Sequence, residues 1–162
     1  MIAHMNLALT SAVLDLGRET VIHLDDDLGA TPFAVDSSFW THSVAARREL
    51  SEGRVLLVSD YTTTWSWWER HPVGEELAFL ISGDVELFLD DDAGQRGVAL
   101  RPGQAVIVPE GAWHRLGVRC PSRLLFVTPT PARTQLREVA PDAHLGGHPT
   151  VARPTDEGAV SI

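Results

Sequence analysis

The sequence predicts an all-β protein, and two observations support this fold class. From Arg54 onward the chain alternates short apolar runs with clusters of Gly, Pro and Asp, as in "ELAFLIS" followed by "SGD". The runs are rich in Val, Thr and aromatic residues, which pack well on a pleated surface. Long segments with helical periodicity are missing from this stretch. Many short strands separated by turns are typical of a β-sandwich or a β-barrel.

The 162 residues are most simply one domain with additions at both ends. Residues 1–53 are expected to form an N-terminal extension that packs on the barrel, with a short strand over residues 19–24 and a polar turn over residues 25–32. Residues 54–130 are expected to form the barrel. Residues 131–162 are rich in Pro and Gly, which predicts a C-terminal arm or a partly disordered tail.

Within the barrel, the apolar runs predict these strands: "RVLLVSDYTTTWSWW", "ELAFLIS", "DVELFLD", "GVALR", "QAVIVP", "HRLGVR" and "RLLFVTP". The clusters between them, including "SGD" and "CPSR", predict turns. Several of the strands are apolar on both faces. This pattern indicates a sheet that is covered on both sides or that packs against a second subunit.

Charge and cysteine content limit the classes of function. Asp and Glu number 22 against 13 Lys and Arg, so the net charge is −9. Because such a chain repels phosphate backbones, nucleic-acid binding is not expected. The single cysteine, Cys120, excludes an intrachain disulfide and favours a cytoplasmic protein. The sequence shows neither a signal peptide nor an apolar run of membrane-spanning length, so no membrane partner is expected.

Ionisable side chains are concentrated in the apolar stretch "WWERHPVGEELAFLISG", residues 67–83. Since side chains alternate along a strand, Glu69 and His71 should point to one face. Trp67 shares that face and is predicted to wall a substrate pocket. The turn "PVGEE" that follows can bring Glu76 back toward the same interior.

A second cluster is "GQAVIVPEGAWH", residues 103–114. A strand enters, "PEG" turns sharply, and His114 opens the next strand. In an antiparallel barrel this order would bring His114 against His71 and Glu76. Two imidazoles and one carboxylate form the facial triad of non-haem Fe(II) oxygenases. Glu69 would add a second carboxylate, and two carboxylates would balance the charge of a divalent ion.

The two clusters resemble the two signature motifs of the cupin superfamily. His71, Glu76 and Gly83 match the second half of the first motif. Gly103, Pro109, Gly111 and His114 match most of the second motif, and every spacing between these residues agrees with the family's pattern. The resemblance covers residues 54–130. It implies the double-stranded β-helix, or jelly-roll barrel, of that superfamily, and it also implies a homodimer.

Three positions depart from the family's pattern. The first histidine of its His-x-His is Glu69 here, the opening Gly is Thr63, and the closing Asn is Val118. The metal that the family implies, bound by three histidines and a glutamate, therefore carries over only to His71, Glu76 and His114. Glu69 stands at the remaining ligand position, either as a fourth metal ligand or as a catalytic general base beside the ion.

Several functions remain open at this stage. The first is a metal-dependent enzyme acting on a small organic molecule, with Fe suiting a dioxygenase and Zn, Mn or Ni suiting an isomerase or hydrolase. The second is a non-catalytic protein that binds or senses a small molecule. A third is a metal-free barrel in which Glu69 pairs with an arginine such as Arg115. Burying this many ionisable groups without a cation is costly unless each is paired.

Overall fold

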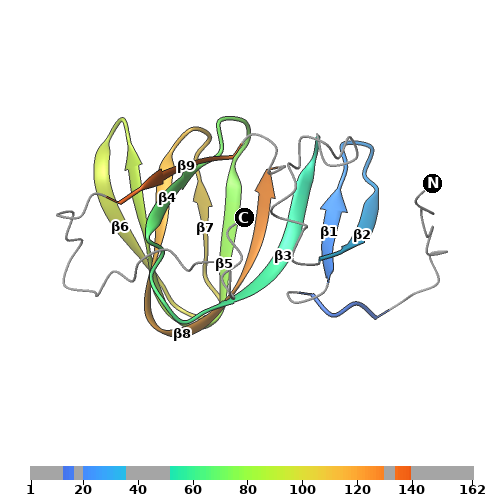
Figure 1. The fold of residues 1–162 in the computed structure, drawn as a ribbon, viewed down its shortest axis with the longest axis horizontal. Coiled ribbons are helices and arrows are strands. Elements are labelled where there is room, and N and C mark those ends of the chain that lie inside the picture. Colours follow the sequence, from blue (N-terminus) through green and yellow to red (C-terminus); the bar gives the residue numbers. More distant parts are fainter. Residues whose placement is uncertain (1–12, 17–19, 36–51, 130–133, 140–162) are drawn as a thin grey trace.

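The computed structural model describes residues 13–16, 20–35, 52–129 and 134–139, and Figure 1 shows their arrangement. Every regular element within these ranges is a strand, which confirms the all-β prediction. This part of the chain contains no helix of the length and apolarity that a membrane span requires. The strands are β1 (Thr20–Leu24), β2 (Ala30–Ala34), β3 (Arg54–Tyr61), β4 (Trp67–Arg70), β5 (Glu76–Asp91), β6 (Gly94–Leu100), β7 (Ala105–Val108), β8 (Trp113–Pro129) and β9 (Gln135–Glu138).

The strands form two layers that share β5 and β8, and all of their pairings are antiparallel. The larger layer has the order β2-β1-β3-β8-β5-β7 and uses the end of β8 and the beginning of β5. The smaller layer has the order β9-β4-β8-β5-β6 and uses the opposite ends of the two long strands. This two-layered antiparallel barrel is the predicted jelly roll. Figure 1 shows the β1–β2 hairpin extending the larger layer beyond β3.

Two turns predicted from the sequence are wrong. The "SGD" segment lies inside β5, which continues through Gly83, and the "CPSR" segment lies inside β8, which continues through Cys120 and Pro121. Around Gly83 the pairing of the two strands shifts register, and Gly83 has a φ of +103°. A Cβ atom there would lie 2.6 Å from Cα of Ser122. Only glycine therefore lets the two strands approach while they bend from one layer into the other.

The core fills the space between the layers and is continuous from one end of the barrel to the other. Its larger members, all at most 8% exposed, are Leu57, Tyr61, Trp65, Leu80, Leu87, Leu116, Leu124 and Phe126. Burying one Leu or Phe side chain contributes about 1.5–3 kcal/mol to folding, so these strands are held mainly by their inner faces. The Tyr61 ring lies 5.8 Å from that of Trp65 and 6.1 Å from that of Phe126.

The outer face of the larger layer is also apolar. One row of cross-strand neighbours consists of Ile22, Leu56, Val127, Leu77 and Ile107. Ile107 is 57% exposed, and its neighbours in the row are partly buried. These strands are therefore apolar on both faces, as the sequence predicts.

Candidate metal centre

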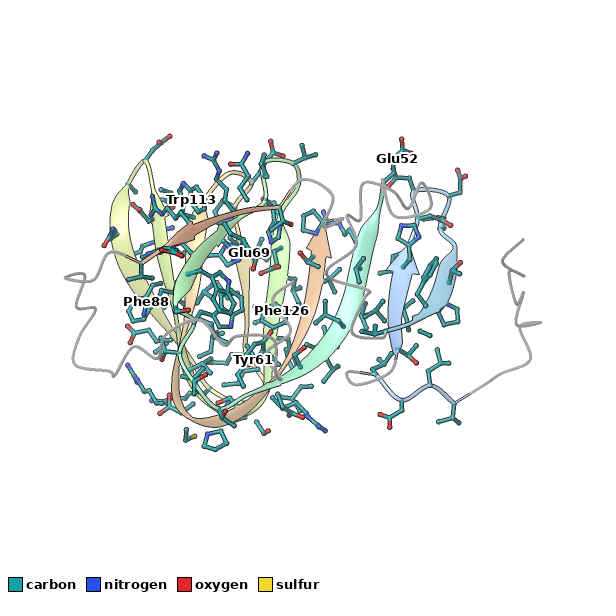
Figure 2. All side chains as sticks on the ribbon, viewed as in Figure 1. Glu52, Tyr61, Glu69, Phe88, Trp113 and Phe126 are labelled. Carbon is teal, nitrogen blue, oxygen red and sulfur yellow. The ribbon has the colours of Figure 1, made fainter. Side chains whose placement is uncertain are left out.

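Four ionisable side chains meet inside the barrel. Glu69 comes from β4, His71 follows that strand directly, Glu76 opens β5, and His114 lies at the start of β8. Their exposed fractions are 1%, 4%, 1% and 0% respectively. Glu69 and His114 are direct register partners of β4 and β8. Figure 2 shows Glu69 inside the barrel, on one side of the aromatic residues Tyr61 and Phe126.

The two sequence clusters are brought together by contacts between their loops. The backbone N–H of Gly111 donates to the carbonyl oxygen of His71 at 2.9 Å. The backbone N–H of Gly74 donates to the Glu110 carboxylate, also at 2.9 Å. Both glycines have a positive φ, +75° for Gly111 and +83° for Gly74, which side chains rarely tolerate. The turns of the two clusters therefore fix each other, and they fix His71 relative to the β7–β8 loop.

The distances between the donor atoms fit a single ion. Two donors that each lie about 2.1 Å from one ion are about 3 to 4.2 Å apart, depending on the angle between the bonds. His71 Nε2 lies 3.1 Å from Glu76 Oε2 and 3.9 Å from Glu69 Oε1. His114 Nε2 lies 3.3 Å from Glu76 Oε1. Glu69, His71 and His114 each offer one donor atom within 4.8 Å of the others, a bound that lies above the upper limit for a single ion.

Three of these donor atoms lack a hydrogen-bond partner among the described residues. They are Glu69 Oε1, Glu76 Oε1 and His114 Nε2. The last two are close to each other, but they are not aligned as a hydrogen bond. A buried polar atom without a partner costs about 1–3 kcal/mol, and more when it is charged. A cation bound between these atoms would remove that cost, because each atom would then share a lone pair with the ion. The donor set therefore fits the metal that the motifs imply.

The two carboxyl groups have opposite protonation tendencies. Burial raises the pKa of Glu69 well above its ordinary value, and the nearby charge of Glu76 raises it further. Burial also acts to raise the pKa of Glu76, but its contacts with His114 and then with His71 outweigh this effect and lower it. Glu76 is therefore the permanent anion of the cluster, and Glu69 is the group that takes up a proton more readily.

The ring of Trp65, which the sequence indicated only as core, lies beside the cluster. It is 6.2 Å from the ring of His114. Trp67, the predicted pocket wall, stacks on Trp65 at 5.6 Å with an interplanar angle of 10°. The Trp65 carbonyl accepts a 2.7 Å hydrogen bond from Arg115 Nε. Because many aromatic residues surround both motifs, the sequence contains no signal that distinguishes Trp65 from its neighbours.

A second residue that the sequence did not indicate is Thr134. It precedes β9, and its hydroxyl oxygen lies 3.1 Å from His71 Nδ1. Thr128 on β8 is also close, with its hydroxyl oxygen 3.3 Å from His71 Nε2. Neither threonine belongs to a motif, and only the folded chain brings them to the histidine.

Comparisons with known proteins address the fold. The family model described as "Cupin domain" matches residues 60–128. The comparison with curated proteins gives no match. Among solved structures, a cupin-2 domain containing protein from Shewanella frigidimarina aligns with 16% identity and a TM-score of 0.41, over 47% of this chain and 70% of that chain.

Two solved enzymes align at a similar level. Hydroxypropylphosphonic acid epoxidase from S. wedmorenis, in complex with fosfomycin, aligns with 22% identity and a TM-score of 0.40, over 46% of this chain and 43% of that chain. Hydroquinone 1,2-dioxygenase from Sphingomonas sp. TTNP3, with 4-hydroxybenzoate bound, aligns with 20% identity and a TM-score of 0.40, over 48% and 59% of the two chains. The aligned part spans less than two thirds of either enzyme, so these likenesses carry no conclusion about activity. The match to the family model identifies residues 60–128 as a cupin domain, and the barrel encloses both motifs.

Proposed function

We propose that the barrel binds a divalent metal ion through His71, Glu76 and His114, and that the protein is a metal-dependent enzyme acting on a small organic molecule. Glu69 serves either as a fourth ligand or as a general base beside the ion. The observation that carries this proposal is the meeting of His71, Glu76 and His114 with Glu69 inside the barrel. In this cluster Glu69 Oε1, Glu76 Oε1 and His114 Nε2 have no hydrogen-bond partner among the described residues.

The charge of the donor set supports a divalent ion. Two carboxylates and two neutral imidazoles supply two negative charges, which an ion such as Fe, Zn, Mn or Ni would balance. When bound, the ion would supply a Lewis acid that polarises a substrate oxygen or, for Fe(II), a centre able to bind substrate and dioxygen together. Compared with the third imidazole of the family's pattern, the Glu69 carboxylate donates more charge to the ion, and we expect it to change the order of affinities for different metals.

The protein's own residues would bind the substrate and handle a proton. The buried Glu69 carboxylate lies beside the proposed ligands, where it would accept a proton from a substrate. The rings of Trp65, Tyr61 and Phe126 pack together in the core, and the Trp65 ring lies next to that of His114, so the cluster has an apolar neighbour on this side. Such a neighbour excludes water and favours a flat, uncharged or aromatic substrate over a charged one.

A second candidate is a non-catalytic protein that binds or senses a small molecule. The burial of the donors favours it, because none of the four side chains is more than 4% exposed. A metal bound by four protein ligands with no open position is typical of structural sites, whereas catalytic sites keep one position open. The two candidates therefore differ in access to the ion.

Metal analysis of the native protein, purified without added metal, tests the proposal. We expect about one divalent ion per chain, loss of turnover with a chelator, and, if the ion is iron, oxygen uptake with a suitable aromatic substrate. Glu69→Ala should lower metal content or turnover and leave the fold intact. Glu75→Ala, at the exposed neighbour of Glu76, is the matched control and should change neither quantity. A native protein free of metal and indifferent to chelator contradicts the proposal, while bound metal without turnover favours the second candidate.

The homodimer that the family resemblance implies is proposed to bury the outer apolar row of the larger layer. Support comes from the continuity of this row across five strands and from the exposure of Ile107. Exposed apolar patches of this kind commonly mark protein–protein interfaces. Light scattering should give twice the chain mass of 17.7 kDa. A mass of one chain at micromolar concentration would contradict the dimer.

A further inference from the structure

The strand that bears Glu69 depends on the C-terminal segment for most of its pairing. β4 has a single register pair with β8, between Glu69 and His114. It has four register pairs with β9, one for each of its residues. The backbone N–H of Val139 also donates to the carbonyl of Ser66, just before β4. Figure 1 shows β9 lying alongside β4. Residues 134–139 therefore hold the strand that leads to His71.

The outer side of β9 is fixed by a cluster of charged and aromatic side chains. Arg137 forms an ion pair with Asp90. Its guanidinium lies 4.5 Å from the ring centre of Trp113 and 5.2 Å from that of Trp68. Arg70 on β4 hydrogen-bonds the Gln135 side chain. These contacts set the position of β9, and hence of Thr134, relative to β4.

Thr134 contacts the ring nitrogen of His71 that faces away from the cluster. Its Oγ1 lies 3.1 Å from His71 Nδ1, while His71 Nε2 faces Glu76 Oε2 at 3.1 Å. A neutral imidazole carries its proton on one nitrogen and a lone pair on the other. Without an ion, Nε2 donates its proton to the Glu76 carboxylate, and Thr134 donates to Nδ1. With an ion bound, Nε2 would offer its lone pair, and the ring proton would lie on Nδ1, where Thr134 Oγ1 accepts it. The opposite tautomer would keep the proton on Nε2 and prevent coordination.

His114 shows the same arrangement with a backbone partner. Its Nδ1 lies 3.5 Å from the carbonyl oxygen of Ala112, and its Nε2 faces Glu76 Oε1. A carbonyl can only accept, so it favours the tautomer that leaves Nε2 free. Metal-binding histidines generally have such an acceptor on their second nitrogen, and its loss weakens metal binding about 10–100-fold. For His71 the acceptor is a side chain 63 positions later in the sequence.

We propose that Thr134 is a positioning residue of the metal centre, which accepts a hydrogen bond from His71 Nδ1 and so presents His71 Nε2 to the ion. This inference rests on the proposed metal site. It gives the segment after the barrel a role in that site, since docking of β9 on β4 delivers the Thr134 hydroxyl to His71.

Titration of the chelator-treated protein with Co²⁺ tests this role through affinity and visible absorption, neither of which requires turnover. Thr134→Val keeps the shape of the side chain and removes the acceptor, and we expect about 10–100-fold weaker Co²⁺ binding with an altered spectrum. Thr134→Ser restores the hydroxyl and should return both quantities close to those of the wild type. Thr62→Val makes the same chemical change at an exposed position and should have no effect.

Two further measurements separate positioning from a loss of structure. Denaturant unfolding without metal should give similar midpoints for the Val and Ser variants. In the Zn²⁺-loaded protein, nitrogen-15 shifts of the His71 ring should report Nδ1–H with a metal-bound Nε2 in the wild type and a smaller population of that form in Thr134→Val. Equal Co²⁺ affinity and an unchanged spectrum for wild type and Thr134→Val would overturn the inference and leave the metal site intact. A wild-type protein that does not bind Co²⁺ would overturn the proposed metal site and the inference together.

Discussion

The four side chains of the candidate metal centre come from two regions of the barrel that differ in how many strand pairings hold them in place. Glu76 and His114 lie on β5 and β8, the two longest strands, which pair with each other along both layers. Glu69 and His71 belong to β4 and the residue after it, and β4 is four residues long. The core of the barrel therefore fixes the positions of Glu76 and His114, the central pair of the site.

The positions of Glu69 and His71, the peripheral pair, are fixed by the pairing of β4 with β9 and by the turn contacts of His71. Because the mobility of a segment rises where buried apolar contacts are few, the β4–β9 edge should open more easily than the β5–β8 centre. The difference suggests that the central pair sets where the ion lies, whereas the peripheral pair can adjust its affinity and chemistry. Three predictions test this contrast.

The largest effect is expected for a cavity in the core of β5, the strand that bears Glu76. Leu80 on β5 is fully buried, and Leu80→Ala should lower the free energy of unfolding by about 2–5 kcal/mol. Leu136 on β9 is 50% exposed, and Leu136→Ala should change it by no more than about 0.5 kcal/mol. Urea denaturation monitored by tryptophan fluorescence measures both. Equal losses for the two variants would mean that the edge is as tightly integrated as the centre.

An intermediate effect is expected for the two carboxylates, with opposite signs in the metal-free protein. The pKa of Glu69 is higher in the folded state than in the unfolded chain, so this group reduces stability as pH rises above the ordinary carboxyl range. Glu69→Gln should therefore stabilise the chelated protein at neutral pH, and the gain should vanish on acidification toward that range. The same variant should weaken metal binding, because the amide carries no charge.

Glu76 supplies the opposite case. Its folded-state pKa is lowered, so its stabilising contribution is present above the ordinary carboxyl range and is lost as pH falls through the lower, folded-state value. Glu76→Gln should thus destabilise the chelated protein at neutral pH. Denaturant unfolding with chelator at neutral and mildly acidic pH checks both variants. A Glu69→Gln protein that is less stable than the wild type at neutral pH would show that the buried carboxylate is already compensated without metal.

The smallest effect is expected at the outer side of β9. Arg137→Ala removes an ion pair with Asp90 and contacts with two tryptophan rings. Since the Arg137 side chain is 40% exposed, solvent screening limits the loss of global stability to about 1 kcal/mol or less. Local opening should increase more clearly, as faster hydrogen exchange of the β4 and β9 amides with little change in β5. Uniform acceleration across the barrel would contradict an independently opening edge.

The sequence was sufficient to predict the fold and the four side chains that meet in the barrel. Alternation along a strand placed Glu69 and His71 on one face, and motif spacing matched His71, Glu76 and His114 to a single centre; the structure brings all four side chains together. Their role as ligands stays a prediction. The barrel itself followed from short apolar runs with turns between them, which is a local signal.

What the sequence could not give depends on long-range contacts. Gly83 and Pro121 lie inside long strands, where the chain bends but does not turn back. Gly and Pro also occur in turns that reverse the chain, so the local sequence cannot distinguish a bend within a strand from a turn between two strands. Thr134 lies in a Pro-rich region that carries no periodic pattern, and its relation to His71 exists only once β9 has paired with β4. Trp65 likewise becomes the neighbour of His114 only through the fold.

The pairing of β3 with β8 joins residues 54–61 to residues 122–129, and the Glu69–His114 pair closes a similarly long stretch of chain. Closing loops of this length costs chain entropy before the strands can form stabilising contacts, and folds with this topology are therefore slow to form. While the newly synthesised chain is still collapsing, the side chains of the candidate metal centre are therefore not yet close together. Metal capture should be among the last events of maturation, and its rate should report when the final strand has docked.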